Sequence, residues 1–316
     1  MTLNTPLLLI AWRRPHTLRQ VIDAIRPLAP TKLYVACDGP NPERPGEAEK
    51  VAATRRVIEQ EIDWHCQIER LYSDVNQGCR VGVSRAISWF FDQVEEGIIL
   101  EDDCVPHPDF FNYCTSLLDR YRDDTRVWCI SGNNFQDGRW RGDGSYYFSR
   151  YSHCWGWASW RRCWQYYDGD LDQWPALRDS GFLETIFPDR NERNYWAQIW
   201  TNLLERGQPN TWDYQWTFTC LINGGLTALP NRNLVRNVGF GEDATHTIGK
   251  SNAPRVDAGI DPSVVPAFIL RDAKADFYTF SRSFRGSQVT AIVEWLVCSA
   301  NLIISFFKRK QTKESV

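Results

Sequence analysis

Residues 98–111, IILEDDCVPHPDFF, decide the fold of this chain. The apolar run at 98–100 ends abruptly in three carboxylates, Glu101, Asp102 and Asp103, directly before a loop punctuated by prolines. A buried strand does not normally end in this way, because adjacent acids repel one another unless a cation neutralises them. The stretch therefore indicates a buried strand that delivers charge to a site.

The residues around this stretch alternate between short apolar runs and longer amphipathic segments. We expect strands at 7–12, 32–39, 67–74, 97–100 and 126–132, and helices at 16–28, 51–62, within 76–94 and at 107–122. Repetition of strand and helix with short apolar strands predicts an α/β fold, with a mostly parallel sheet that helices flank.

In such a sheet, ligands bind beyond the carboxyl ends of the strands. The predicted ends carry Arg13 and Arg14, Asp38, and the acids at 101–103, so all of them should meet at one edge. Asp38 would accept a hydrogen bond from the N3–H of a uracil or thymine, and the arginines would contact a diphosphate. The plainer alternatives are a turn at Asp38 and a solvated turn at the triplet.

Beyond residue 133 the alternation stops. The segment 151–164, YSHCWGWASWRRCW, is dense in tryptophan and has little period of either kind, whereas 193–206 predicts a helix and 210–230 a helix or strand followed by a strand. We predict a nucleotide-binding half at 1–132, a Trp-rich donor-sugar and acceptor half at 133–250, and a C-terminal extension at 251–316.

The composition is that of a soluble globular protein, with 43% hydrophobic and 24% charged residues. The net charge of -3 gives no electrostatic argument for a nucleic-acid partner. The 10 cysteines show no C-x-x-C pair and no zinc-ligand spacing, which favours reduced thiols and a cytoplasmic protein. The N-terminal apolar run lacks the features of a signal peptide and is interpreted as a strand.

The C-terminal extension contains a 19-residue apolar stretch at 289–307, with Glu294 as its one charge and the basic residues KRK behind it. Three interpretations stay open: a helix that packs on the protein, peripheral membrane contact through 289–310, and a membrane span. Glu294 and Asn301 make the span the weakest of the three.

A divalent cation would neutralise the acid triplet. Mg²⁺ and Mn²⁺ take few protein carboxylates and leave positions open for phosphate oxygens. An ion held by Asp103, together with Asp102, would suit a diphosphate leaving group.

With these motifs in order, the chain resembles nucleotide-sugar glycosyltransferases of the GT-A (Rossmann-like) fold over roughly residues 5–250. It is most similar to inverting enzymes of the kind exemplified by the N-acetylglucosaminyltransferase that begins complex N-glycan branches. Four features carry the resemblance: Arg13 with Asp38; DVNQGCRVGVSRA at 74–86, similar to the Asn-x-Gly segment of family-two transferases; the EDD triplet; and WGWASW with the later WDYQW.

The resemblance implies roles for the matching residues. The metal, Mn²⁺ or Mg²⁺, would be bound by Asp103. The nucleotide and donor sugar would be contacted by the side chains of Arg13, Asp38, Asn76, Arg80, Glu101, Asp102 and Trp157. Tryptophan faces stack on pyranose rings, so Trp157 and its neighbours at 155–156 would wall the sugar site, with plain core packing as the alternative.

Asp213, in TWDYQWTF, is the predicted catalytic base, because Trp212 and Tyr214 flank it and partly desolvate it. The motif has one acid where the resembling enzymes have two, and Glu242 or Asp243 could serve instead. His246 is predicted to be a second metal ligand, with an exposed loop histidine as the alternative.

The predicted function is metal-dependent transfer of a hexose, with inversion, from a UDP- or dTDP-linked donor to a saccharide or lipid-linked acceptor, in bacterial-type surface glycan assembly. Two other classes stay open. A metal-dependent phosphoryl-transfer or hydrolytic enzyme would also need clustered acids at strand ends. A non-catalytic carbohydrate-binding protein would need the tryptophans alone.

Overall fold

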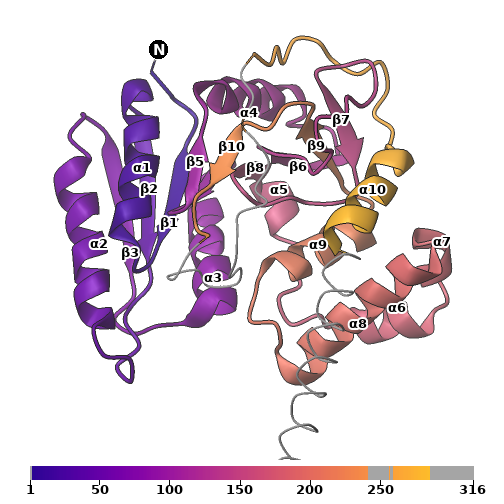
Figure 1. The fold of residues 1–316 in the computed structure, drawn as a ribbon, viewed down its shortest axis with the longest axis horizontal. Coiled ribbons are helices and arrows are strands. Elements are labelled where there is room, and N and C mark those ends of the chain that lie inside the picture. Colours follow the sequence, from indigo (N-terminus) through magenta and orange to yellow (C-terminus); the bar gives the residue numbers. More distant parts are fainter. Residues whose placement is uncertain (1, 241–255, 257–258, 285–316) are drawn as a thin grey trace, which may run out of the picture.

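The computed structural model describes residues 2–240, 256 and 259–284 (Figure 1). The described chain forms an eight-stranded sheet in the order β3-β2-β1-β4-β8-β6-β9-β7. Its strands are β1 (Leu7–Ala11), β2 (Lys32–Cys37), β3 (Gln67–Tyr72), β4 (Glu96–Glu101), β6 (Val127–Ser131), β7 (Tyr146–Ser149), β8 (Trp157–Trp160) and β9 (Leu226–Pro230). Only β7 and β8 run against the others, which confirms the predicted α/β fold with a mostly parallel sheet.

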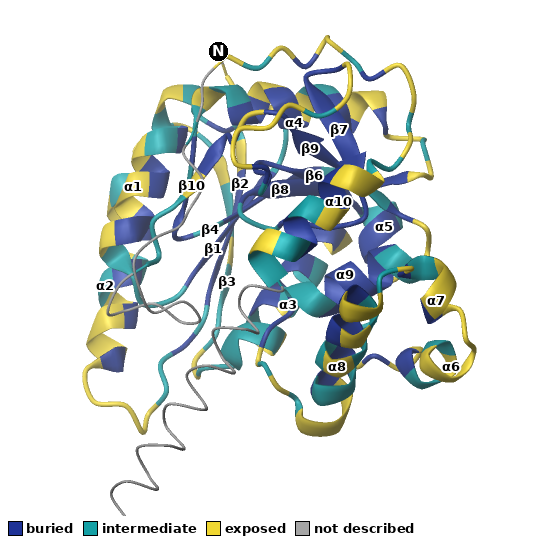
Figure 2. Ribbon diagram, turned by 45° about the vertical axis from the view of Figure 1, so that its right-hand side comes forward, coloured by how far each residue is buried: buried dark blue, intermediate teal, exposed yellow. Residues whose placement is uncertain are grey.

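The described helices are α1 (Pro15–Ile25), α2 (Glu47–Glu61), α3 (Gly78–Gln93), α4 (Pro108–Arg120), α5 (Arg161–Trp164), α6 (Trp174–Asp179), α7 (Leu183–Ile186), α8 (Arg190–Arg206), α9 (Asp213–Ile222) and α10 (Ala273–Thr279), with short turns of helix at η1 (Arg26–Leu28) and η2 (Phe280–Phe284). Helices α1 and α2 lie on one side of the β1–β4 half of the sheet and α3 on the other (Figure 2). Because both faces are covered, all five residues of β1 are buried.

Local sequence explains why α1 begins and packs where it does. Pro15 stands at its first turn, where the missing N–H is harmless and the fixed φ suits a helix. Leu18, Val21, Ile22 and Ile25 recur three to four residues apart and are all buried, so one face of the helix meets the sheet.

Strands β7 and β8 were not predicted. All four residues of each strand are buried, so neither shows the alternation of apolar and polar residues that marks a strand with one wet face. Strand β8 lies between β4 and β6 and pairs with both in antiparallel fashion. A two-stranded antiparallel ribbon of β5 (Cys104–Pro106) and β10 (Val235–Asn237) starts directly after the acid triplet.

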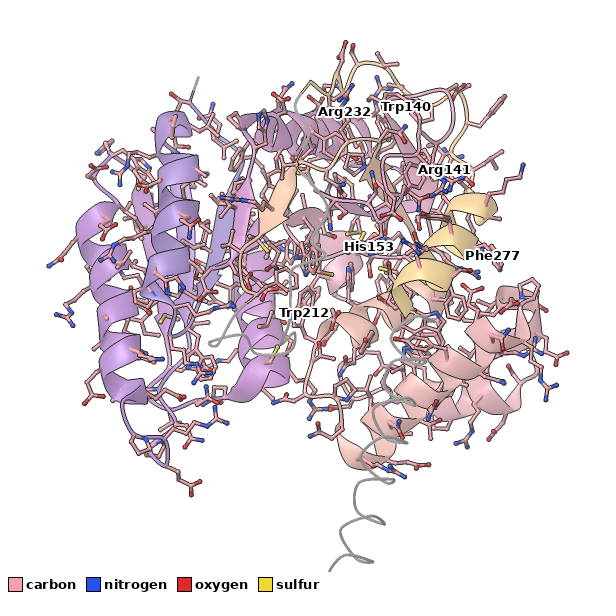
Figure 3. All side chains as sticks on the ribbon, viewed as in Figure 1. Trp140, Arg141, His153, Trp212, Arg232 and Phe277 are labelled. Carbon is pink, nitrogen blue, oxygen red and sulfur yellow. The ribbon has the colours of Figure 1, made fainter. Side chains whose placement is uncertain are left out.

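The tryptophans of the second half build core. Trp157 in β8 is 1% exposed and stacks on Trp212, with ring centroids 5.5 Å apart, and it also packs on Trp216 and Trp164. Trp212 lies near the centre of the molecule in Figure 3. A second apolar cluster, around Trp196 and the helices α6 to α9, lies beyond this group.

None of the helices in the described part of the chain has the length and apolarity to cross a membrane. The predicted helix at 289–307 lies outside the described residues. The division into 1–132, 133–250 and 251–316 stays a prediction.

Candidate functional site

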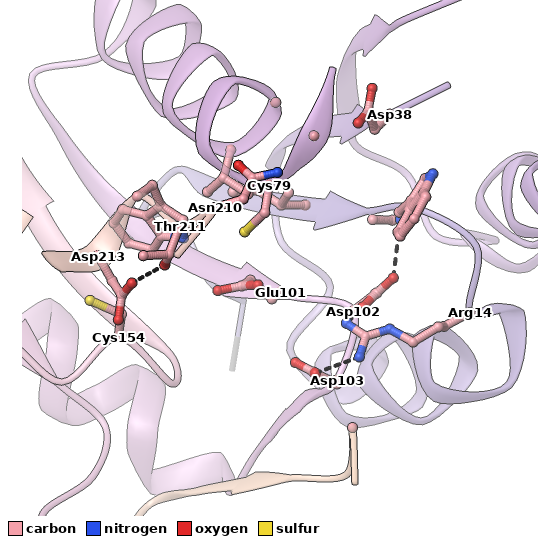
Figure 4. A pocket seen from close by; sticks show the side chains of 18 of the residues that line it. Arg14, Asp38, Cys79, Glu101, Asp102, Asp103, Cys154, Asn210, Thr211 and Asp213 are labelled. Atoms are coloured by element: carbon pink, nitrogen blue, oxygen red, sulfur yellow. Dashed lines mark hydrogen bonds and ion pairs between the residues drawn. The ribbon is translucent and has the colours of Figure 1, made fainter. Parts of the chain in front are cut away.

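The carboxyl ends of β1, β2, β3 and β4 open into a cleft of about 1050 Å³. The start of α3, the segment 209–212 and the start of α9 complete its walls. Side chains predicted from the sequence line this cleft: Arg13, Arg14, Asp38, Asn76, Glu101, Asp102, Asp103, Trp155 and Asp213. The prediction that the strand ends meet at one edge of the sheet is therefore confirmed, and Figure 4 shows several of these residues together.

The guanidinium group of Arg14 supplies a positive charge to two carboxylates of the acid triplet. Arg14 donates from Nη1 to Oδ2 of Asp103 at 2.7 Å and from Nη2 to Oδ1 of Asp102. The second oxygen of Asp102 accepts the Trp12 backbone N–H at 3.1 Å. The Arg14 side chain is 12% exposed, and burial opposes its charge, yet the Asp102 and Asp103 carboxylates raise its pKa above the usual value.

The resemblance implies a divalent ion at these carboxylates. Among residues 2–240, 256 and 259–284, no group of three or more His, Cys, Asp or Glu side chains is arranged to hold a metal ion. Asp102 and Asp103 are both engaged by Arg14, so the described donor set does not fit the ion. His246 lies outside the described residues, and its metal role stays a prediction.

Asp38 holds the chain that enters α3. Its carboxylate accepts the backbone N–H of Gly39 at 2.8 Å and of Gln77 at 3.0 Å, and the side-chain amide of Asn76 at 3.1 Å. Burial outweighs these bonds and raises the Asp38 pKa. The two predicted nucleotide-binding residues therefore contact each other, and the fit of a nucleobase to Asp38 stays a prediction.

Two arginines of the cleft, Arg13 and Arg44, approach one buried carboxylate, that of Glu47. Glu47, 2% exposed, pairs with Arg13 at 2.9 Å and with Arg44 at 3.7 Å. Its second oxygen accepts the Asn41 backbone N–H at 2.7 Å. The Arg13 guanidinium also lies over the Trp12 ring, 4.3 Å from the ring centroid. One carboxylate thus faces two guanidinium groups, which leaves positive charge on this wall of the cleft.

Glu101 and Asp213 also line the cleft (Figure 4). Burial, followed by the charge of Asp103, raises the pKa of Glu101 above its usual value. The Asp213 carboxylate accepts a hydrogen bond from the Thr211 hydroxyl at the start of α9. Burial raises the pKa of the Cys79 thiol beside them, which keeps this thiol protonated and a poor nucleophile at neutral pH.

The structure places two predicted donor-binding residues elsewhere. Arg80 is not among the residues that line the cleft, and its guanidinium lies 3.5 Å from the exposed carboxylate of Asp170. Trp157 is a core residue, as described above, so its predicted role in walling the sugar site is corrected. Trp155, two residues earlier, does line the cleft. The cause is β8: this strand lies between β4 and β6, and its Trp157 ring packs against Trp212 and Trp216.

Several residues of the cleft were not predicted: Arg44, Cys79, Arg85, Cys154, Tyr195, Asn210 and Thr211. Arg44 lies in the Pro-rich loop after β2, where the Arg-x-x-Glu spacing to Glu47 is the one local signal of a pair. Asn210 and Thr211 lie just before the predicted base, Asp213, and no sequence motif marks them as site residues. Glu242 and Asp243, the alternative bases, lie outside the described residues.

No family model matches the chain, and no curated protein is significantly similar to it. Solved structures with some likeness include mouse xyloside xylosyltransferase 1, at 11% identity and a TM-score of 0.34, covering 69% of this chain and 81% of that one. A cytidylyltransferase from Leptospira borgpetersenii has 9% identity and a TM-score of 0.33, covering 61% and 74%. A glycosyltransferase involved in glycosylation of the PBCV-1 major capsid has 11% identity and a TM-score of 0.26, covering 65% and 78%. Likeness at this level carries no argument about activity, and the fold rests on the strand order itself.

Proposed function

We propose that this protein is a glycosyltransferase that moves a hexose from a UDP- or dTDP-linked donor to a hydroxyl group of a saccharide or lipid-linked acceptor, with inversion. One observation carries the proposal. One cleft at the carboxyl ends of the parallel strands holds an arginine-rich wall around Arg13 and also the partly buried carboxylate of Asp213. The arginines suit a diphosphate and the carboxylate suits a general base.

Asp213 takes the base role in this proposal. The acceptor oxygen attacks the anomeric carbon while its proton passes to the Asp213 carboxylate. The bond between the anomeric carbon and the diphosphate oxygen breaks, and its electron pair leaves with the nucleoside diphosphate. The Thr211 hydroxyl, which donates to Asp213, supports a fixed orientation of this carboxylate. The proposal assigns no step to a divalent ion, because Arg14 engages Asp102 and Asp103.

The test is to identify the product. The full-length protein is incubated with UDP- and dTDP-hexoses and a panel of sugar and lipid-linked acceptors, and the released nucleotide is separated by chromatography. We expect release of the nucleoside diphosphate, and the anomeric configuration of the glycoside, read by NMR, should be opposite to that of the donor. Release of a nucleoside monophosphate with a sugar phosphate would place the attack at phosphorus and favour the hydrolytic alternative.

Variants separate chemistry from binding. Asp213→Asn should lower turnover by about 10²- to 10⁴-fold, the usual contribution of a general base, with nucleotide affinity unchanged. Asp179→Asn, an exposed acid in the same half of the chain, is the matched control and should keep full turnover. Unchanged turnover in Asp213→Asn would overturn the assignment of the base. Binding of oligosaccharides without any nucleotide binding would favour a carbohydrate-binding protein.

A further inference from the structure

We propose that the donor diphosphate is bound without a divalent ion: Arg14 occupies the acid cluster at the end of β4, and Arg13 and Arg44 receive the diphosphate. This inference rests on the proposed function, since it concerns the same cleft and the same class of donor. It departs from the expectation that the sequence raised, in which the acid triplet binds Mn²⁺ or Mg²⁺.

The first support is the number of carboxylate oxygens that are already used. Both oxygens of Asp102 are engaged, one by Arg14 and one by the Trp12 backbone N–H, and Arg14 also engages Oδ2 of Asp103. All three charged side chains are nearly buried, with exposures of 12% for Arg14, 3% for Asp102 and 12% for Asp103. An entering ion would have to displace a buried guanidinium and leave it unpaired, which is strongly unfavourable.

The second support is the backbone that closes over this pair. Any side chain at Gly239 would clash with Oδ2 of Asp103 and with Nη1 of Arg14. The Val238 N–H donates to the Asp103 carbonyl oxygen at 2.8 Å and fixes this approach. Oδ2 of Asp103 therefore has Arg14 on one side and the Gly239 backbone on another.

The third support is the unbalanced charge at Glu47. Arg13 and Arg44 approach the same oxygen of this buried carboxylate, so two positive charges face one negative charge. A diphosphate brings negative oxygens in the geometry that guanidinium groups bind in pairs. Arg44 is 58% exposed and stands in a loop, so its guanidinium has room to turn from Glu47 to a ligand. Glu47 then acts as a positioning residue for both arginines.

The experiment is calorimetric titration of UDP and dTDP into the full-length protein, once in EDTA and once in Mn²⁺, with a separate titration of Mn²⁺ alone. We expect one nucleotide to bind with the same affinity, within about threefold, in both buffers, and Mn²⁺ alone to show no binding. Arg44→Gln should weaken binding by at least about tenfold. Arg56→Gln, an exposed arginine on α2, is the matched control and should bind as the wild type does.

The outcomes separate the two proposals. Nucleotide binding that requires Mn²⁺, or tight binding of Mn²⁺ alone, would overturn the metal-free site and leave the glycosyltransferase proposal intact. Metal-independent binding that Arg44→Gln leaves unchanged would overturn the role of the Glu47 arginines. Absence of nucleotide binding in both buffers would overturn the proposed function itself. Arg44 is exposed, so its substitution tests binding without endangering the fold.

Discussion

Arg150 and Glu192 form an ion pair inside the protein, although 42 residues separate them in sequence. Nη2 of Arg150 donates to both Glu192 oxygens at 2.9 Å, and the two side chains are 7% and 3% exposed. The Tyr151 hydroxyl also donates to Glu192, and Asp276 of α10 lies 3.7 Å from the Arg150 Nε. This group of buried charges fastens the end of β7 to α8 and α10.

Removal of one partner should leave the other buried and unpaired. We expect Glu192→Ala to lower the free energy of unfolding by about 3–5 kcal/mol, measured by urea denaturation. Glu205→Ala, on the exposed face of the same helix, should change it by less than about 0.5 kcal/mol. Equal effects of the two substitutions would mean that the buried pair has no special weight.

Asp38 should matter for stability as well as for any ligand. Asp38→Ala removes the acceptor for the Gly39 and Gln77 backbone N–H groups, so we expect a loss of about 1–3 kcal/mol in unfolding free energy. Asp38→Asn keeps one acceptor oxygen and should lose less. Asp74→Ala, in an exposed position of the adjacent loop, serves as the control. A fully stable Asp38→Ala variant would mean that water replaces the carboxylate.

Substitutions of the two tryptophans in the WGW motif, Trp155 and Trp157, should have different effects on stability and on ligand binding. Trp157→Ala empties a buried site and should destabilise the protein by about 3–5 kcal/mol. Trp155→Ala, at the cleft, should change stability by less than about 1 kcal/mol and weaken binding of the sugar nucleotide. Denaturant unfolding and calorimetry of the same samples measure both effects. A Trp157→Phe variant with normal stability and lost sugar binding would restore the role first predicted for Trp157.

Acid should destabilise the protein through His153. Burial lowers its pKa from the usual 6.5 to about 3, and its ring packs edge-on against Phe135 with centroids 4.6 Å apart. Between these two pH values the unfolded chain binds a proton that the folded chain does not. Stability is therefore lost as the pH falls below 6.5, by about 2–3 kcal/mol at pH 4.5.

The measurement is urea denaturation at pH 7.5 and 4.5. In His153→Phe the part of the pH dependence that comes from His153 should disappear, whereas His65→Phe, at an exposed position, should retain it. If His153→Phe and the wild type lost the same stability in acid, the burial of His153 would not be the cause.

The sequence predicted the edge of the sheet at which the cleft lies, because the carboxyl ends of parallel strands must meet there. It did not predict how the charges pair across that edge. Arg14 and Asp103 are 89 residues apart, and no local pattern states that one neutralises the other. The pairing of Arg13 with Glu47 likewise depends on the path of the loop after β2.

Trp157 shows a different limit. A tryptophan beside glycine suits both a sugar-binding wall and a buried strand, and only the pairing of β8 with β4 and β6 separates the two. Trp155 lines the cleft, whereas Trp157, two residues later, is buried in the core. Local composition does not reveal this difference. Strands β7 and β8 were missed for the same reason, since fully buried short strands show no alternation.

The position of β8 in the sheet has a consequence for how the protein is made. Strands β1 to β4 pair with one another within residues 7–101, whereas β6 pairs with β9 about 100 residues later in the chain. Sequence-local pairings form fastest, and N-terminal units fold first on the ribosome. The first four strands are thus able to assemble during translation with the edge of β4 open. Emergence of β8 then covers that edge and protects the growing chain from aggregation.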